Sequence, residues 1–179
     1  MTEAERYERY LNIEHYLPFR AADRLKEMGF FTAPASTKYH GAYEGGLFDH
    51  SYNVAQTLDK LTERNHLNWS RPESHWVIGL FHDLCKVDQY AAAPANSNED
   101  KPYVYNTDTL YKGHGDKSVM LLSTFTQLTD EEVACIRYHM GAFTEKEEWT
   151  FYIRAIHRFQ NVLWTHTADM IAAHVIEVD

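Results

Sequence analysis

One stretch of the chain, from Glu73 to Gln89, constrains the fold more than any other. Read as a helix, it carries apolar side chains on nearly every side: Trp76, Val77, Ile78, Leu80, Phe81, Leu84 and Val87. A helix of this kind must be covered by other elements, so we expect it to be the central helix of a bundle. It also contains two adjacent polar residues, His82 and Asp83, and burying such groups without a partner costs several kcal/mol. The stretch therefore predicts a helical fold with a compensated polar site at its centre.

Most of the remaining chain also shows helical patterns. We expect helices over about 2–16, 19–28, 47–64, 116–127 and 129–139, and one bent helix or two over 147–178. Gly29 suits the end of the second helix, and Asp116 suits the start of the helix over 116–127. Thr129 with Glu132 fits a capping box for the helix that follows. Residues 30–46 are predicted to form a long loop.

Residues 91–112 form the least regular part of the sequence. Ala91 to Asp100 are predicted to form a mobile loop. Tyr103 to Tyr105 have the pattern of a short strand, which would be half of a small hairpin. The predicted fold class is therefore an all-α bundle with at most a small β-hairpin near 103–112.

The composition limits the class of protein. At 179 residues the chain fits one domain with a sizeable core. Its net charge of −9 argues against an extended nucleic-acid surface, although bound cations would still allow a small anionic substrate. No apolar run approaches the ~20 residues of a membrane span, and the charged N-terminus is unlike a signal peptide. Because only Cys85 and Cys135 occur, we expect a protein of the reducing cytoplasm.

Further candidate metal ligands are scattered along the chain: His50, His114, His139 and Asp169. His50 lies on the apolar face of the helix expected over 47–64, and Asp169 lies on an inward stripe of the last helical region. We interpret four residues as ligands of one metal: His50, His82, Asp83 and Asp169. His114 and His139 would serve a second metal that Asp83 bridges.

Imidazole and carboxylate ligands suit several divalent metals. The expected cofactor is one or two such ions per chain, from among Fe, Mn, Zn, Co and Ni. Alternatively, a single metal is bound, and His114 and His139 donate hydrogen bonds to substrate. Cys85, close to the His-Asp pair, is interpreted as a small core residue rather than a ligand.

The candidate ligands resemble the defining motif of the HD-domain metal-dependent phosphohydrolases, at His50, His82-Asp83 and Asp169. The additional His114 and His139 are similar to those of the two-metal branch of that superfamily. Residues 34–50 (PASTKYHGAYEGGLFDH) and 113–118 (GHGDKS) are similar to the HD domain of bacterial 3′–5′ exoribonucleases, where an OB-fold comes first. Here we expect two short helices instead of an OB-fold. The resemblance covers roughly residues 30–178, and it implies a single HD domain over 1–179, with N-terminal helices over 1–29 and the HD core over 30–178.

The resemblance implies an enzyme that hydrolyses a phosphate mono- or diester of a nucleotide or short oligonucleotide through a metal-activated water. Asp83 and Lys86 are the expected catalytic residues, because Lys86 would offer its cation to phosphate. The alternative role of Lys86 is a salt bridge to a nearby carboxylate. Lys86 is expected to bind substrate together with His40, Tyr105 and Lys112, as the loop over 91–112 folds over the entrance. The expected partner is a small phosphorylated molecule, and the oligomeric state is not predicted.

Two other functions fit the same residues. HD-type di-iron oxygenases such as myo-inositol oxygenase are similar down to a lysine one turn after the His-Asp pair, but they activate O₂ and act on a small organic substrate. An HD domain can also serve as a non-catalytic binding or sensor module. The remaining histidines are assigned to packing or the surface (His15, His66, His75, His157) or, at most, to hydrogen bonds that support the ligands (His166, His174).

Overall fold

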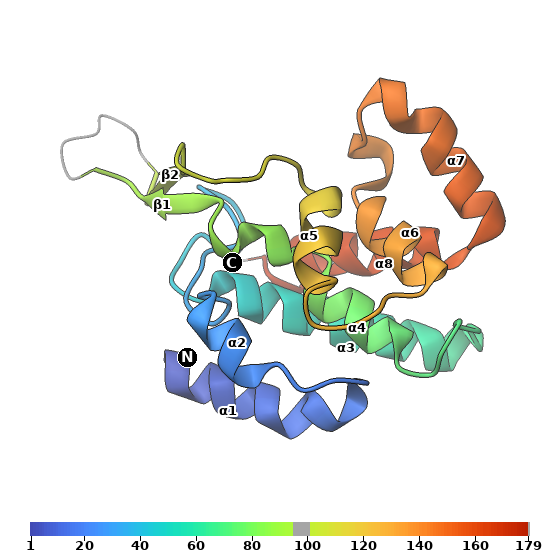
Figure 1. The fold of residues 1–179 in the computed structure, drawn as a ribbon, viewed down its shortest axis with the longest axis horizontal. Helices are drawn as coiled ribbons and strands as arrows, with labels where there is room; N and C mark the ends of the chain where they lie inside the picture. The colour runs from blue at the N-terminus through green and yellow to red at the C-terminus, as the bar shows by residue number, and fades with distance from the viewer. Residues whose placement is uncertain (95–100, 179) are drawn as a thin grey trace.

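The computed structural model describes residues 1–94 and 101–178, and it is mostly helical (Figure 1). Helix α3 (Gly46–Asn65) packs along α4 (Ser74–Phe81), and α8 (Asn161–Ile171) packs against both. The N-terminal helices lie on one side of this core, while α7 and the small hairpin project at opposite ends of the molecule (Figure 1). The predicted all-α class with a small hairpin is confirmed.

The other helices and turns have these bounds: α1 (Glu3–Ile13), η1 (Glu14–Tyr16), α2 (Ala22–Glu27), η2 (Leu84–Val87), α5 (Gly115–Leu122), α6 (Asp130–Arg137), η3 (Gly141–Phe143), η4 (Lys146–Glu148), α7 (Trp149–Arg158) and the π-helix η5 (Ala172–Ile176). The region over 147–178 is thus two α-helices followed by a π turn. None of the described helices is long and apolar enough to cross a membrane.

Helix α4 is the buried central helix that its composition predicts. Val77, Ile78, Leu80 and Phe81 have no exposed surface. Gly79 lies where α3 comes closest, since a Cβ on it would be 2.4 Å from Cα of Ala55. The tight packing of α3 against α4 brings the backbones that carry His50 and His82 together.

The helix expected over 73–89 is shorter than predicted and ends at Phe81. Asp83 has φ −104° and ψ 17°, outside the α-helical range, and the chain then tightens into the 3₁₀ turn η2. Successive side chains of a regular helix diverge around its axis. The break therefore allows His82 and Asp83 to face the same point.

The small sheet pairs β1 (Tyr90–Ala92) with β2 (Tyr103–Tyr105) in antiparallel fashion. The strand predicted at 103–105 is confirmed, and its partner strand precedes it in the chain. The mobile loop predicted over 91–100 overlaps β1 at its beginning, and residues 95–100 lie outside the described residues.

The capping position of helix α5 is His114, two residues before the predicted Asp116, and the helix ends at Leu122. Gly115 contacts α6 so closely that a Cβ would lie 2.3 Å from the carbonyl oxygen of Arg137. The predicted capping box at the start of α6 is confirmed, because Thr129 and Glu132 each accept a hydrogen bond from the other's backbone N–H. The close contact of Gly115 with Arg137 holds the start of α5 against the end of α6. His114 and His139 lie next to these two helix ends.

Candidate metal centre

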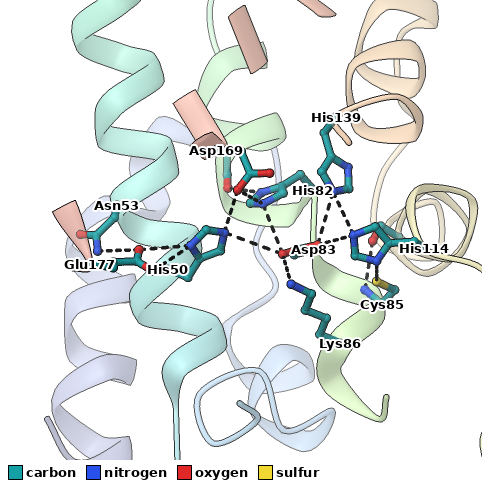
Figure 2. Close-up of polar contacts among 12 residues, drawn as sticks. His50, Asn53, His82, Asp83, Cys85, Lys86, His114, His139, Asp169 and Glu177 are labelled. Atoms are coloured by element: carbon teal, nitrogen blue, oxygen red, sulfur yellow. Dashed lines mark hydrogen bonds and ion pairs between the residues drawn. The ribbon is translucent and has the colours of Figure 1, made fainter. Parts of the chain in front are cut away.

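The structure brings all six candidate ligands into one buried cluster (Figure 2). They come from elements far apart in the sequence: His50 from α3, His82 and Asp83 from the end of α4, His114 from the start of α5, His139 from the turn after α6, and Asp169 from α8. His50, His82, Asp83 and His139 are at most 2% exposed. The cluster thus lies in the interior of the bundle.

Asp83 stands between two groups of histidines, as Figure 2 shows. Its Oδ2 faces Nε2 of His82 at 3.5 Å and Nε2 of His50 at 3.8 Å. Its Oδ1 faces Nε2 of His114 at 3.0 Å and Nε2 of His139 at 3.4 Å. One carboxylate therefore presents an oxygen to each group, which is the arrangement required of a bridging ligand.

Asp169 completes the first group. Its Oδ1 lies 3.1 Å from Nε2 of His50 and 3.9 Å from Nε2 of His82. With Asp83 these residues form a mixed nitrogen and oxygen set of the kind that divalent transition metals accept.

Each of the four histidines is held through Nδ1, so that Nε2 points into the cluster. Nδ1 of His82 contacts the carbonyl oxygen of Gly79 at 2.9 Å, and Nδ1 of His139 contacts that of Ile136 at 2.7 Å. The other two Nδ1 atoms meet side chains, as described below for His50 and His114. Occupying Nδ1 in this way fixes the ring orientation and leaves Nε2 available for a metal.

Three inward atoms of the cluster make no hydrogen bond of good geometry within the described part of the chain: Nε2 of His50, Nε2 of His82 and Oδ1 of Asp83. Two of them lie only at ion-pair distance from a neighbouring ligand, His50 from Asp169 and Asp83 from His114. Buried polar atoms are nearly always satisfied, so unsatisfied ones need an explanation. All three belong to residues whose lone pairs converge on one region. The residues present therefore fit a divalent cation, which would satisfy all of them at once.

Lys86 lies on η2, three residues after Asp83, and is buried beside it. Its Nζ is 2.6 Å from Oδ2 of Asp83, so the salt bridge considered from the sequence is present. Burial works to raise the pKa of Asp83, but the opposing charges of Lys86, His82 and His114 hold that pKa well below its usual range. The carboxylate is thus ionised at neutral pH, as a metal ligand must be.

The electrostatics of His50 are also unusual. Burial works to lower its pKa, and the contacts with Asp169 and Glu177 outweigh burial and raise the pKa to about 9. Without a metal, the two carboxylates therefore favour a protonated imidazole at this position.

A cavity of about 600 Å³ opens beside the cluster. Asp83, Lys86, His114, His139 and Asp169 line it together with groups that reach outward, among them His40, Tyr90, Tyr105, Arg137, Phe143 and His174. The ring of His40 lies 4.9 Å from that of His50. Of the three additional residues expected to bind substrate, His40 and Tyr105 line the cavity. Lys112 is exposed and is not among the lining residues.

Two residues that the sequence did not indicate as partners contact the histidines. Glu177 lies 3.1 Å from Nδ1 of His50. Cys85 is fully buried, as expected of a core residue, but its Sγ also lies 3.1 Å from Nδ1 of His114. No local signal marks Glu177, because its partner is 127 residues away and the π turn before it changes the helical register. The position of Cys85 two residues after Asp83 was the only available hint of its role.

Of the other histidines, two lie near the centre. His166 contacts the backbone carbonyl of His139 through Nδ1 at 2.8 Å, a supporting hydrogen bond of the predicted kind. His174 lines the cavity. His75 pairs with Asp59 away from the cluster, in keeping with a packing role.

The chain matches the protein-family model described as HD domain, over residues 47–171. This span includes the six candidate ligands but not Glu177. A search of curated proteins and a search of solved structures found no match. The more specific similarity to exoribonuclease HD domains and the division into 1–29 and 30–178 stay predictions.

Proposed function

The chain belongs to the HD domain family, and on this basis we propose that it is a metal-dependent phosphohydrolase that cleaves a phosphate mono- or diester of a nucleotide or short oligonucleotide. The observation that carries this proposal is the position of Asp83, whose two oxygens face two groups of histidines at the wall of a cavity. Members of this family are generally metal-dependent hydrolases.

In this proposal the cluster holds one or two divalent transition metals. His50, His82, Asp83 and Asp169 would hold the first, and His114 and His139 would hold the second together with Asp83. Bound there, a divalent metal lowers the pKa of water and neutralises charge on the phosphoryl oxygens.

Lys86 lies between Asp83 and the space open to substrate. Its Nζ forms a salt bridge with Oδ2 of Asp83, and the residue also lines the cavity. A cation at this wall attracts the anionic phosphoryl group of a substrate and stabilises charge as the ester bond breaks. Asp83 and Lys86 are therefore the residues to which we assign the chemistry.

The size of the cavity favours a small substrate. About 600 Å³ lies within the range of small-molecule sites, and the net charge of −9 disfavours a long polyanion. Tyr90 and Tyr105 lie at its wall with ring centroids 5.4 Å apart, where an aromatic base could stack. In this proposal His40, which lines the cavity beside His50, contacts the same substrate.

The experiment combines metal analysis with a substrate panel. Protein purified without chelator is measured for metal content, reconstituted separately with Mn, Fe, Co, Ni and Zn, and assayed on nucleoside monophosphates, cyclic nucleotides and short oligonucleotides. Hydrolysis that His82→Ala abolishes would support the proposal. A protein that binds metal but turns over none of these compounds would contradict it. O₂ uptake by the iron-loaded protein with small organic substrates would instead favour the oxygenase alternative.

A further inference from the structure

Glu177 is the one side-chain carboxylate among the groups that hold the four histidines through Nδ1 in the described structure. His82 and His139 are held by backbone carbonyls, and His114 is held by the thiol of Cys85. Both oxygens of Glu177 lie 3.1 Å from Nδ1 of His50 (Figure 2). The Glu177 side chain is only 13% exposed, so solvent does little to weaken this contact.

A second contact fixes the carboxylate itself. Nδ2 of Asn53 donates to Oε1 of Glu177 at 3.0 Å, and Asn53 lies on α3 one turn after His50. Glu177 therefore bridges two residues on the same helix. This bridge gives the carboxylate a defined position relative to the imidazole, rather than a choice of many rotamers.

The π turn at the end of the chain brings Glu177 to this position. The backbone N–H of Glu177 donates to the carbonyl oxygen of Ala172, five residues earlier, at 3.0 Å. A π turn contains more residues than an α turn, and such turns occur frequently at functional sites. Asp169 and Glu177, eight residues apart, consequently reach opposite nitrogens of the same imidazole, Nε2 and Nδ1.

We propose that Glu177 is a positioning residue for the metal centre, which holds His50 as a carboxylate–histidine pair so that Nε2 is directed to the metal. The inference rests on the metal site of the proposed function. Carboxylates behind a metal-ligating histidine orient the ring and increase its basicity, and loss of such a partner typically weakens metal binding by about 10–100-fold.

The test measures metal affinity and the ligand field rather than activity. The dissociation constant for Co²⁺ is obtained by competition with a chromophoric chelator, and the visible spectrum of the Co²⁺ protein reports the ligand geometry. The variants are Glu177→Ala, Glu177→Gln, Asn53→Ala and His50→Ala. Glu145→Gln is the matched control, since it removes one negative charge from the lining of the same cavity, and Glu145 makes no hydrogen bond or ion pair with His50 in the described part of the chain. Melting of each protein without metal shows whether the fold is intact.

We expect Glu177→Ala to weaken Co²⁺ binding at least tenfold and to shift the spectrum. Glu177→Gln keeps an acceptor for Nδ1–H and should recover part of the affinity, and Asn53→Ala should cause a smaller loss than Glu177→Ala. Wild-type affinity and spectrum in Glu177→Ala would overturn the inference and leave the proposed function standing. Binding in wild type no tighter than in His50→Ala would overturn the metal site, and with it both proposals.

Discussion

Nζ of Lys86 lies 2.6 Å from Oδ2 of Asp83, the carboxylate oxygen that also faces His50 and His82. The lysine is 8% exposed, so the pair is shielded from solvent. A buried cation next to a ligand carboxylate is not needed to neutralise that carboxylate once a metal is bound. Its charge is then free to act on an anionic group in the adjoining cavity.

Lys86→Met is therefore expected to slow catalysis strongly while leaving metal binding intact. Loss of a charged group that stabilises the transition state costs about 10²–10³ in kcat, and the loss of a nearby positive charge should not weaken cation binding. The measurement is kcat together with metal content of the same sample. Lys60→Met, on the exposed side of α3, serves as the control. A Lys86→Met protein that lacks metal would show that the lysine maintains the site rather than acting on substrate.

Metal stoichiometry tests the two groups of histidines on either side of Asp83. His139→Ala removes a residue whose Nε2 lies 3.4 Å from Oδ1 of Asp83, and it should lower the content from near two metals per chain to near one. His82→Ala removes a residue of the other group and should lower it further, because Asp83 loses its neighbour on the same turn. Plasma mass spectrometry on protein prepared without chelator gives the numbers. One metal in wild type, unchanged in His139→Ala, would assign His114 and His139 to substrate instead.

Metal binding should release a proton from His50. Burial lowers the pKa of His50, but Asp169 and Glu177 raise it overall, from the ordinary value of 6.5 to about 9. In the metal-free protein, the stabilisation from protonated His50 is complete below pH about 6.5 and disappears as the pH rises through about 9. The melting temperature without metal should consequently fall over this window. Over the same window metal affinity should rise, because fewer protons compete for the imidazole.

Calorimetric titrations in buffers of different ionisation enthalpy measure this proton release. The release should be close to one proton from His50 at pH 7 and vanish above pH 9. Glu177→Ala should reduce it, since one of the two carboxylates that raise the pKa is then gone. A metal affinity that does not change between pH 6.5 and 9 would contradict the assignment of His50 as a ligand.

The sequence was sufficient to select the six residues that the structure brings together and to predict most of the helices that carry them. His50 follows the apolar periodicity of α3, and the capping box at Thr129 sets the start of α6; both signals are local. The break after Phe81 was missed because the residues that follow it, including Leu84 and Val87, continue a helical pattern of apolar side chains. Tertiary contacts of Asp83 decide its backbone conformation, and periodicity does not record them.

The role of Glu177 could not be predicted from its surroundings in the chain for a similar reason. The π turn before Glu177 is determined by tertiary contacts and not by local sequence. Glu177 contacts His50 on α3, which is 127 residues away in the chain. Likewise, Tyr90 showed no sign of a role at the cavity, since it reaches that wall only by pairing opposite Tyr105 in the hairpin.

Tyr105 provides a test of the substrate-binding assignment. It lines the cavity and is 68% exposed, so its ring is accessible to an aromatic ligand. If a base stacks there, Tyr105→Ala should raise KM about tenfold, because base–aromatic stacking contributes about 1–3 kcal/mol, and Tyr105→Phe should remain near wild type. Steady-state kinetics on a nucleotide and on a phosphate ester without an aromatic ring separate the effects. An equal rise in KM for both substrates would exclude stacking. Lys112→Ala, measured alongside, tests whether that exposed lysine contributes at all.

Gly79→Ala is expected to damage both the fold and the metal centre. A Cβ at this position would lie 2.4 Å from Cα of Ala55, so α3 and α4 must move apart. Overpacking of a core typically costs about 1–3 kcal/mol. The carbonyl oxygen of Gly79 also contacts Nδ1 of His82. Moving α4 away from α3 would therefore separate His82 from His50, which lies on α3. We therefore expect a lower melting temperature without metal and weaker Co²⁺ binding in the same variant. Unchanged metal affinity despite a lower melting temperature would mean that the cluster adapts to the separation of the two helices, and that their close approach serves stability alone.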